Sequence, residues 1–398
     1  MKRLIPLFLC LVLVFSMLPV SALADKTVTI NVYNWGQYIS DGTDDYIDVN
    51  AAFTEATGIE VNYMTFDSNE TMYTKLKNGG SSYDVIIPSD YMVARLIAED
   101  MLEELNFDNI PNYQLVDEAY KNTAYDPDNK YSVPYTWGTV GLIYNSKYVD
   151  EADTGSWDLL WNPKYAGKIL MFDNPRDAFA ISQFLLGISI NTQDPDELRS
   201  VAYKLIEQKP LVQAYVMDQI FSAMEHEEAW IAPYYAGDYL LMAEENEDLS
   251  FYFPEEGFNL FIDAMCIPKC CQNKEAAEAY INFLCDPEIS GQNLDYLGYS
   301  TPISSAKEYM DPETAESEIA YPTDDVLARG DAFMYLDTET SQLCDALWLQ
   351  VKTQGSVDTY AIVCMCALVV LGISYLVIHN IRSKKRIANR CKKWKTET

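Results

Sequence analysis

Histidine, cationic side chains and known catalytic motifs are scarce in this chain of 398 residues. The two histidines are His226 and His379, and His226 stands in the acidic run 225–228. The sequence contains no G-x-S-x-G, no H-E-x-x-H and no glycine-rich phosphate loop, which are motifs of serine hydrolases, zinc proteases and nucleotide hydrolases. We therefore expect no catalytic residue and no enzyme activity.

The shortage of positive charge is concentrated in one part of the chain. Lys and Arg total 28 against 60 Asp and Glu, which gives a formal net charge of −32. Residues 25–359 alone carry a net charge of −41, because both ends of the chain are basic. Such a field repels nucleic acid and attracts cations, so no nucleic-acid partner is expected. A generic acidic surface of an exported protein would account for the same charge.

The cysteines have no spacing typical of a metal site or a disulfide framework. Residues 25–359 hold five of the nine, which are Cys266, Cys270, Cys271, Cys285 and Cys344. The vicinal pair in this set lacks the second spaced pair of a zinc site. We therefore expect neither a bound metal nor a cofactor, and the sequence leaves the state of these thiols open.

Both ends of the chain have the composition of targeting segments. Residues 1–24 begin Met-Lys-Arg, continue as a short apolar run and end Ala-Leu-Ala, the pattern of a secretory signal peptide. Residues 360–378 contain no charge and are long enough to span the ~30 Å hydrocarbon core of a bilayer. Eight cations follow this run, and such an excess of positive charge places a C-terminus in the cytoplasm.

These segments predict a protein of the cell membrane whose ligand-binding domain is extracytoplasmic. Residues 353–359 are expected to form a stalk, residues 360–378 a transmembrane helix and residues 379–398 a basic cytoplasmic tail. The alternative for 360–378 is a buried core helix at the end of a domain. The basic block behind it is more typical of a stop-transfer signal.

The residues between the ends predict an α/β fold with two lobes. About 335 residues exceed one typical hydrophobic core. Residues 27–91 alternate strand, helix, strand, helix and strand, which predicts a parallel sheet with covering helices. We expect a mainly parallel sheet with flanking helices in each lobe. Residues 26–136 and 258–303 would form the first lobe, and residues 137–257 and 304–352 the second. The D-x-x-E sequence at 67–70 predicts a capping box.

Two large aromatic side chains, Trp35 and Tyr38, follow the first expected strand. They either pack under a loop or line a cleft, because ligands of α/β sheets bind outside the carboxyl ends of the strands. The third expected strand also ends in an aromatic and polar loop, residues 88–91. The carboxyl ends of parallel strands face the same crevice, which favours the cleft.

Four stretches of the chain resemble the spermidine/putrescine-binding subfamily of bacterial solute-binding proteins, the external receptors of ABC importers. They are YNW at 33–35 with Tyr38, DSNETMY at 67–73, VIIPSDY at 85–91 and VPYTWG at 133–138. The resemblance covers roughly residues 28–352. It implies a type II periplasmic-binding-protein-like fold, a polyamine ligand, ABC permease subunits as partners, and delivery of the ligand by hinge closure.

The resemblance also implies which residues hold the ligand. In that family, aromatic rings flank the methylene chain of a polyamine and carboxylates take its ammonium ends. The corresponding positions of this chain are Trp35, Tyr38, Ser89, Tyr91, Asp177, Tyr235, Asp238, Phe261, Asp263 and Tyr299.

Asp263 is expected at one end of the ligand and Asp177 or Asp238 at the other. Tyr235 and Phe261 replace the indoles of the family, and together with Asp238 these departures favour a putrescine-like pattern.

The chemistry of a polyamine agrees with these residue types. Aromatic faces bury each CH₂ group for about 0.8 kcal/mol and add about 0.5–2 kcal/mol for each cation–π contact. A buried ammonium needs an ionised partner, because an unpaired charge in a closed cleft is very costly.

The same residue types also suit roles without a polyamine. The alternative role for Asp177 and Asp238 is that of helix N-caps, and the alternative for the aromatic residues is core packing. Paired acids in an aromatic cleft also occur in glycosidases, although the order of segments argues against one. The same fold also suits a receptor for another organic cation or a sensory receptor, and an adhesion protein would bind no small ligand.

Overall fold

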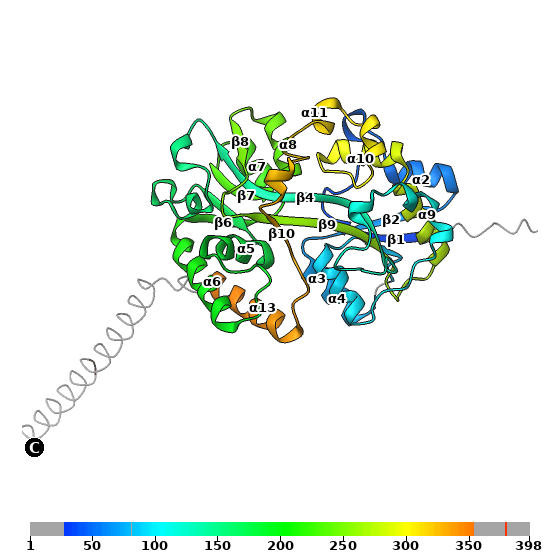
Figure 1. The fold of residues 1–398 in the computed structure, drawn as a ribbon, viewed down its shortest axis with the longest axis horizontal. Helices are drawn as coiled ribbons and strands as arrows, with labels where there is room; N and C mark the ends of the chain where they lie inside the picture. Colours follow the sequence, from blue (N-terminus) through cyan, green and yellow to red (C-terminus); the bar gives the residue numbers. More distant parts are fainter. Residues whose placement is uncertain (1–27, 81, 354–378, 380–398) are drawn as a thin grey trace, which may run out of the picture.

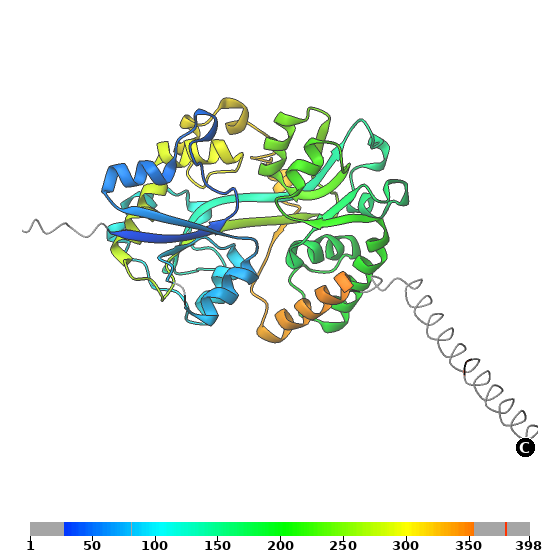
Figure 2. The same ribbon diagram turned by 180° about the vertical axis from the view of Figure 1, so that it is seen from behind.

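The computed structural model describes residues 28–80, 82–353 and 379. Within them, helices pack around strands that cross the molecule (Figures 1 and 2). The strands are β1 (Thr29–Trp35), β2 (Glu60–Phe66), β3 (Val85–Ile86), β4 (Ser132–Asn145), β5 (Ile169–Phe172), β6 (Val212–Val216), β7 (Ile231–Tyr235), β8 (Leu249–Tyr252), β9 (Phe258–Cys266) and β10 (Gly330–Ala332).

The α-helices alternate with these strands along most of the chain. They are α2 (Val49–Thr57), α3 (Asn69–Asn78), α4 (Asp90–Ala98), α5 (Pro175–Leu186), α6 (Pro195–Gln208), α7 (Ile220–Glu225), α8 (Ala236–Glu245), α9 (Lys274–Leu284), α10 (Pro287–Leu297), α11 (Pro312–Ala315), α12 (Asp324–Leu327) and α13 (Thr338–Thr353). Short 3-10 helices occupy several of the connections.

The strands form one hydrogen-bonded path in the order β2-β1-β3-β9-β4-β7-β5-β6, with β10 beside β9 and β8 beside β4. The outer strands pair in parallel, as β1 does with β2 and β3, and β5 with β6 and β7. The central strands β4 and β9 pair antiparallel with each other and with most of their neighbours. The expectation of mainly parallel sheets is therefore wrong at the centre. These strands run directly across the molecule in opposite directions, and antiparallel strands need no crossover helix between them.

Strands β4 and β9 connect the two halves of the molecule. Figure 1 shows them side by side across the middle, with β1–β3 on one side and β5–β8 on the other. Strand β4 exchanges partners along its length: residues 132–139 pair with β9, and residues 140–145 pair with β7 and β8. The segment that contains β10 lies along β9 and continues to α13, which packs on α5 and α6. The middle of the molecule is therefore built from these two strands and the segment beside them.

Local sequence rules predict the side chains at several helix N-termini. Asp48 and Asn174 accept hydrogen bonds from backbone N–H groups at the starts of α2 and α5. For α3 the capping residue is Ser68, whose hydroxyl accepts from the Thr71 N–H at 3.2 Å. The capping box expected to start at Asp67 is wrong by one residue. The Asp67 carboxylate is therefore not used by the helix.

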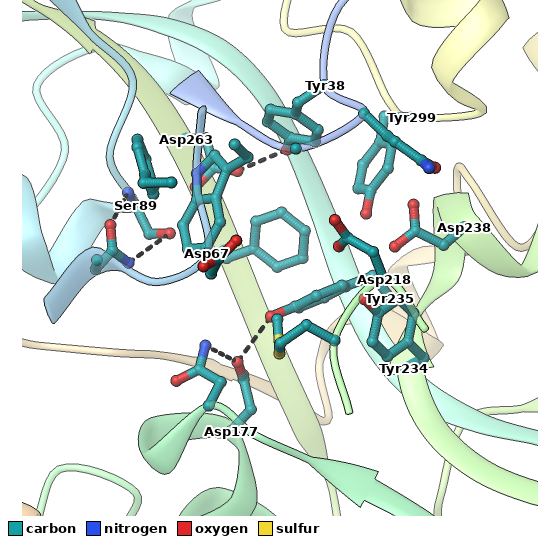
Figure 3. Close-up of a pocket in the computed structure, with 18 of the residues that line it drawn as sticks. Tyr38, Asp67, Ser89, Asp177, Asp218, Tyr234, Tyr235, Asp238, Asp263 and Tyr299 are labelled. Atoms are coloured by element: carbon teal, nitrogen blue, oxygen red, sulfur yellow. Dashed lines mark hydrogen bonds between the residues drawn. The ribbon is translucent and has the colours of Figure 1, made fainter. Parts of the chain in front are cut away.

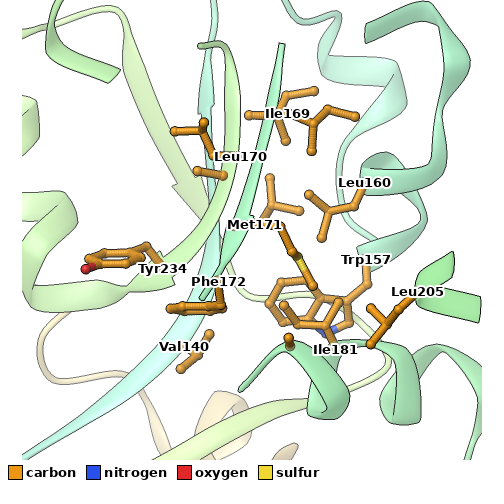
Figure 4. Packing of buried hydrophobic residues seen from close by; sticks show 14 of the residues in the cluster. Val140, Trp157, Leu160, Ile169, Leu170, Met171, Phe172, Ile181, Leu205 and Tyr234 are labelled. Atoms are coloured by element: carbon orange, nitrogen blue, oxygen red, sulfur yellow. The ribbon is translucent and has the colours of Figure 1, made fainter. Parts of the chain in front are cut away.

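Apolar side chains form a dense core around the strands of the half that contains β5 (Figure 4). Trp157 lies at its centre with no exposed surface, and packs near Met171, Ile181 and Leu205. Its indole N–H donates to the Gly257 carbonyl at 2.8 Å, so the buried polar atom is satisfied. Further buried apolar clusters surround β1, β3 and the middle of β9.

The expected segments at the two ends lie outside the described residues. These are the signal peptide at 1–24, the transmembrane helix at 360–378, nearly all of the stalk and, apart from His379, the basic tail. Among residues 28–80, 82–353 and 379, no helix has the length and apolar character needed to span a bilayer.

Replacing Trp157 tests the importance of this core. Trp157→Ala should lower the free energy of unfolding of the full-length chain by about 3–5 kcal/mol, because it opens a cavity and removes the partner of Gly257. Leu349→Ala is the control, since this side chain is 64% exposed and should change stability by less than about 0.5 kcal/mol. Urea unfolding measures the free energy of unfolding of both variants. Equal losses would contradict the placement of Trp157 at the centre of the core.

Candidate functional site

The ten residues that the sequence predicts as ligand-binding line a single cavity between the two halves of the molecule. Figure 3 shows most of them around a common space. The wall also includes residues that were not predicted, namely Gly36, Gln37, Phe66, Asp67, Asn69, Asn174, Met217, Asp218, Phe221, Tyr234, Asn259 and Phe333. Segments from β1 to the stretch after β10 therefore meet at one place.

Strand ends and helix starts position these side chains. Trp35 ends β1, and Tyr38 follows in the next loop. Asp177 and Asp238 both lie in the first turn of a helix, α5 and α8, but neither is the capping residue. The sequence left open an N-cap role for these two carboxylates. In the structure, neither of them is the N-cap residue of its helix. Both are available to the cavity.

Asp263 projects into the cavity from the middle of β9. It is 3% exposed, and the Tyr38 hydroxyl donates to its Oδ2 at 2.6 Å. Its other oxygen, Oδ1, is buried and has no hydrogen-bond partner among the described residues. Burial raises the pKa of Asp263 to about 6, although the hydroxyls of Tyr38 and Ser89 oppose the shift. Leaving a buried carboxylate oxygen without a hydrogen bond costs free energy. We therefore expect a ligand to bring the hydrogen-bond donor for Oδ1.

Asp177 is a second buried carboxylate on the opposite wall of the cavity. Its Oδ2 accepts from the Asn174 amide at 2.7 Å and from the Tyr235 hydroxyl at 2.9 Å. Burial raises the pKa of Asp177 to about 7, and the hydrogen bond from Tyr235 only partly offsets this. Asn174 therefore both caps α5 and orients the carboxylate.

Two more carboxylates, Asp238 and Asp218, gather at the other end of the cavity from Asp263. Figure 3 shows them together beside Tyr299. Burial raises the pKa of Asp238 to about 8, and the negative charge of Asp218 adds to the shift. Burial and then the charge of Asp67, the fifth carboxylate of the wall, raise the pKa of Asp218.

Aromatic rings form the walls between these carboxylates. Tyr38 and Tyr299 meet edge to face with ring centroids 5.2 Å apart, and Tyr235 meets Phe261 at 5.4 Å. The Tyr299 ring lies against Gly237, where an added Cβ would be 2.6 Å from the ring. Only glycine permits this close approach, which places Tyr299 next to Asp238.

Ser89 and Tyr91 reach the cavity from the start of α4. Asn69 fixes both, because its amide donates to the Ser89 hydroxyl and to the Tyr91 hydroxyl at 3.1 Å each. Tyr91 in turn donates to Glu70 at 3.0 Å. The stretch at 67–73 therefore holds the stretch at 85–91 in position.

The cavity is acidic without a cation of its own. Five carboxylates line it, and none of the described residues in its wall is Lys, Arg or His. No group of His, Cys, Asp and Glu side chains in residues 28–80 and 82–353 has the arrangement of a metal site. The negative charge of the cavity therefore suits an organic cation with donors at two ends.

Asp67 and Asp218 are the two carboxylates of the wall that sequence reasoning missed. The sequence predicted Asp67 as the start of a capping box, and it predicted no role for Asp218. Asp218 approaches the loop after β1, since its Oδ2 lies 2.7 Å from the position of a Cβ on Gly36. Gly36, in the turn between Trp35 and Tyr38, was the only hint in the sequence that another group approaches this turn. It did not indicate Asp218, which lies in a distant part of the sequence.

Comparison with known proteins identifies the family. The family model described as bacterial extracellular solute-binding protein matches residues 81–328. The spermidine/putrescine-binding periplasmic protein of Escherichia coli (strain K12) is 33% identical over 312 residues, which cover 78% of this chain and 88% of that protein. The putrescine-binding periplasmic protein SpuD of Pseudomonas aeruginosa is 29% identical, and the match covers 89% of this chain and 99% of that protein.

A solved structure agrees with the sequence comparisons. The spermidine/putrescine ABC transporter substrate-binding protein PotD from Streptococcus pneumoniae is 38% identical, with a TM-score of 0.68 over 82% of this chain and 98% of that one. The family resemblance and the periplasmic-binding-protein-like α/β fold expected from the sequence are confirmed. The chain belongs to the bacterial extracellular solute-binding proteins, among the relatives of the spermidine/putrescine-binding periplasmic proteins.

Proposed function

We propose that this protein binds a polyamine of the putrescine or spermidine type and delivers it to an ABC importer. The observation that carries the proposal is the Asp263 carboxylate, buried with one oxygen unpartnered in an aromatic cavity whose described wall contains no cation. The names of the relatives support the same ligand class. Such a receptor binds its ligand and performs no catalysis on it.

The carboxylates suggest how a linear diamine lies in the cavity. One ammonium donates to Asp263 Oδ1, and the other lies between Asp238 and Asp218. Tyr38, Tyr235, Phe261 and Tyr299 would cover the methylene chain between them. Each buried CH₂ contributes about 0.8 kcal/mol, and the spacing of the carboxylates then selects the length of the ligand. Asp177, beside Tyr235, is the natural partner for an additional amine.

We propose that ligand binding closes two lobes about β4 and β9. Residues 26–136 and 258–303 would form one lobe, and residues 137–257 and 304–352 the other. Carboxylates of both lobes line the cavity, so closure without a cation brings like charges together, whereas an ammonium ligand favours the closed form. The permease would recognise that form.

The protein is proposed to act outside the cytoplasm while attached to the membrane. Residues 1–24 would direct export, and residues 360–378 would anchor the C-terminal side of the receptor, with the basic tail in the cytoplasm. The short stalk would keep the cavity close to the permease. A sensory role, or another organic cation as ligand, is the alternative, and an adjacent gene for a sensor kinase in place of a permease would favour sensing.

Removing one carboxylate charge tests the ligand placement. Asp263→Asn should weaken putrescine binding tenfold or more, about 1.4 kcal/mol, because the amide cannot neutralise an ammonium. Asp158→Asn, at an exposed position, is the matched control and should bind normally. Calorimetry on the full-length chain with putrescine, spermidine and spermine gives the affinities, and thermal unfolding checks the fold. Unchanged affinity in Asp263→Asn would remove this residue from the site.

The raised pKa values of Asp263, Asp177 and Asp238, at about 6, 7 and 8, predict a pH dependence of binding. A polyamine keeps its charge in this range, but the carboxylates lose theirs as the pH falls. Putrescine affinity should therefore drop at least tenfold between pH 8.5 and pH 5.5. Binding at pH 6.5 should release protons, which calorimetry in buffers of different ionisation enthalpy detects.

The same shifts act on stability with a definite sign. In the unliganded protein these carboxyls bind protons more tightly when folded than when unfolded, where their pKa is about 3.9. Their contribution to the free energy of unfolding is therefore greatest below about pH 4 and declines as the pH rises to about 8. Putrescine offsets this loss, so the rise in melting temperature on adding it should be larger at pH 8.5 than at pH 5.5. The opposite order would contradict an ionised site.

A further inference from the structure

A second cavity lies on the other face of β9. Side chains alternate across a strand, so Asn259 and Asp263 face the first cavity, whereas Leu260 and Ile262 line the second. Phe261 and Phe333 border both. The second cavity measures about 560 Å³, within the range of ligand pockets of proteins.

The other walls of this cavity come from segments far apart in the chain. Trp137 of β4 and the loop at 120–125 form one side, and the segment at 327–335, which carries β10, forms the other. The Tyr120 and Trp137 rings stack with centroids 5.8 Å apart. Most of the lining is aromatic or aliphatic, so the cavity favours an apolar body.

Two buried polar groups stand in this apolar lining. Asp90 is 3% exposed, and its oxygens accept from the Tyr91 N–H at 2.6 Å and the Ile262 N–H at 3.4 Å. Tyr125 is 9% exposed, and its buried hydroxyl makes no hydrogen bond of good geometry among the described residues, although Thr123 is near enough to lower its pKa. Asp90 and Tyr125 line the same cavity. Burial is the main cause of the raised pKa of Tyr125, and the charge of Asp90 adds to it.

The charged neighbours of Asp90 leave it without a direct counter-ion. Asp263 is close enough to raise the pKa of Asp90 further, beyond the effect of burial. Arg176 lowers that pKa, but its guanidinium lies over the Phe333 ring at 4.3 Å and forms no ion pair with Asp90 in the described part of the chain. A cation beside Asp90 would therefore gain a carboxylate, a phenol oxygen and aromatic faces.

We propose that this second cavity binds a small monoamine with an aromatic body, an arylalkylamine. The ammonium would donate to Asp90 and Tyr125, and the ring would pack against Trp137 and Tyr120. Asp90 is the only carboxylate among the described residues of the lining, so a second ammonium would be buried without a partner. The two cavities therefore suit different ligands, because the wall of the first has five carboxylates.

Phenethylamine is the probe that tests this site, by calorimetry on the full-length chain. One molecule should bind per chain. 2-Phenylethanol, which has the ring without the charge, and propylamine, which has the charge without the ring, should each bind at least tenfold more weakly. No binding of phenethylamine at millimolar concentration, or equal binding of the three compounds, would overturn the proposal.

Substitutions locate the bound amine. Asp90→Asn should weaken phenethylamine binding tenfold or more. Ala124→Phe should do the same by placing a ring at the mouth of the cavity, and because Ala124 is exposed, this variant should fold even if Asp90→Asn does not. Asp128→Asn, whose side chain is 75% exposed in the same loop, is the control.

Asp177→Asn distinguishes the two cavities. It should leave phenethylamine affinity within twofold of the unaltered chain, since Asp177 lines only the first cavity. A loss in Asp177→Asn, with no loss in Ala124→Phe, would assign the amine to the first cavity and refute the second site. Because the readout is phenethylamine alone, the result does not depend on whether the first cavity binds a polyamine.

Discussion

Carboxylates buried among aromatic rings, with no cation of the protein beside them, are the constraint that governs this structure. Removing an ionised carboxylate from water is costly unless a counter-ion replaces the hydration. Here burial raises the pKa values of Asp263, Asp177 and Asp238. The wall of the cavity in the described residues supplies no Lys, Arg or His. The missing positive charge has to come from outside, so the cavity is complete only with a cationic ligand.

The two central strands turn this local constraint into a property of the whole molecule. Strands β4 and β9 pass between the halves, and carboxylates from both halves project into the same space. A cation shared by the two sides would stabilise the closed arrangement over an open one. The alternation of β9 also gives each of its faces a separate cavity, since Asp263 points to one side and Ile262 to the other. A single strand therefore carries residues for the proposed polyamine site and for the proposed monoamine site.

A site residue could be predicted from the sequence when its signal was local. The motifs at 33–38 and 85–91 contain Trp35, Tyr38, Ser89 and Tyr91, and the resemblance to the solute-binding family supplied the other six of the ten proposed site residues, all of which line the cavity. Asp67 was misinterpreted because a D-x-x-E pattern predicts a cap equally well, and the structure uses Ser68 instead. Asp218 had no local signal, because its place opposite Gly36 depends on how the halves meet. The sequence also did not predict the mixed parallel and antiparallel pairing around the central strands, because that pairing likewise depends on how the halves meet.

The sequence by itself determined the fold class, the family and the residue types of the cavity, because periodicity, helix caps and motif residues are properties of short segments. It also determined the absence of a built-in catalytic motif and the strong negative charge. Only the tertiary structure decided which carboxylates share a space, which oxygen of Asp263 lacks a partner and how far burial shifts each pKa. Those quantities depend on desolvation and on distances between segments far apart in the chain, and no local pattern contains them.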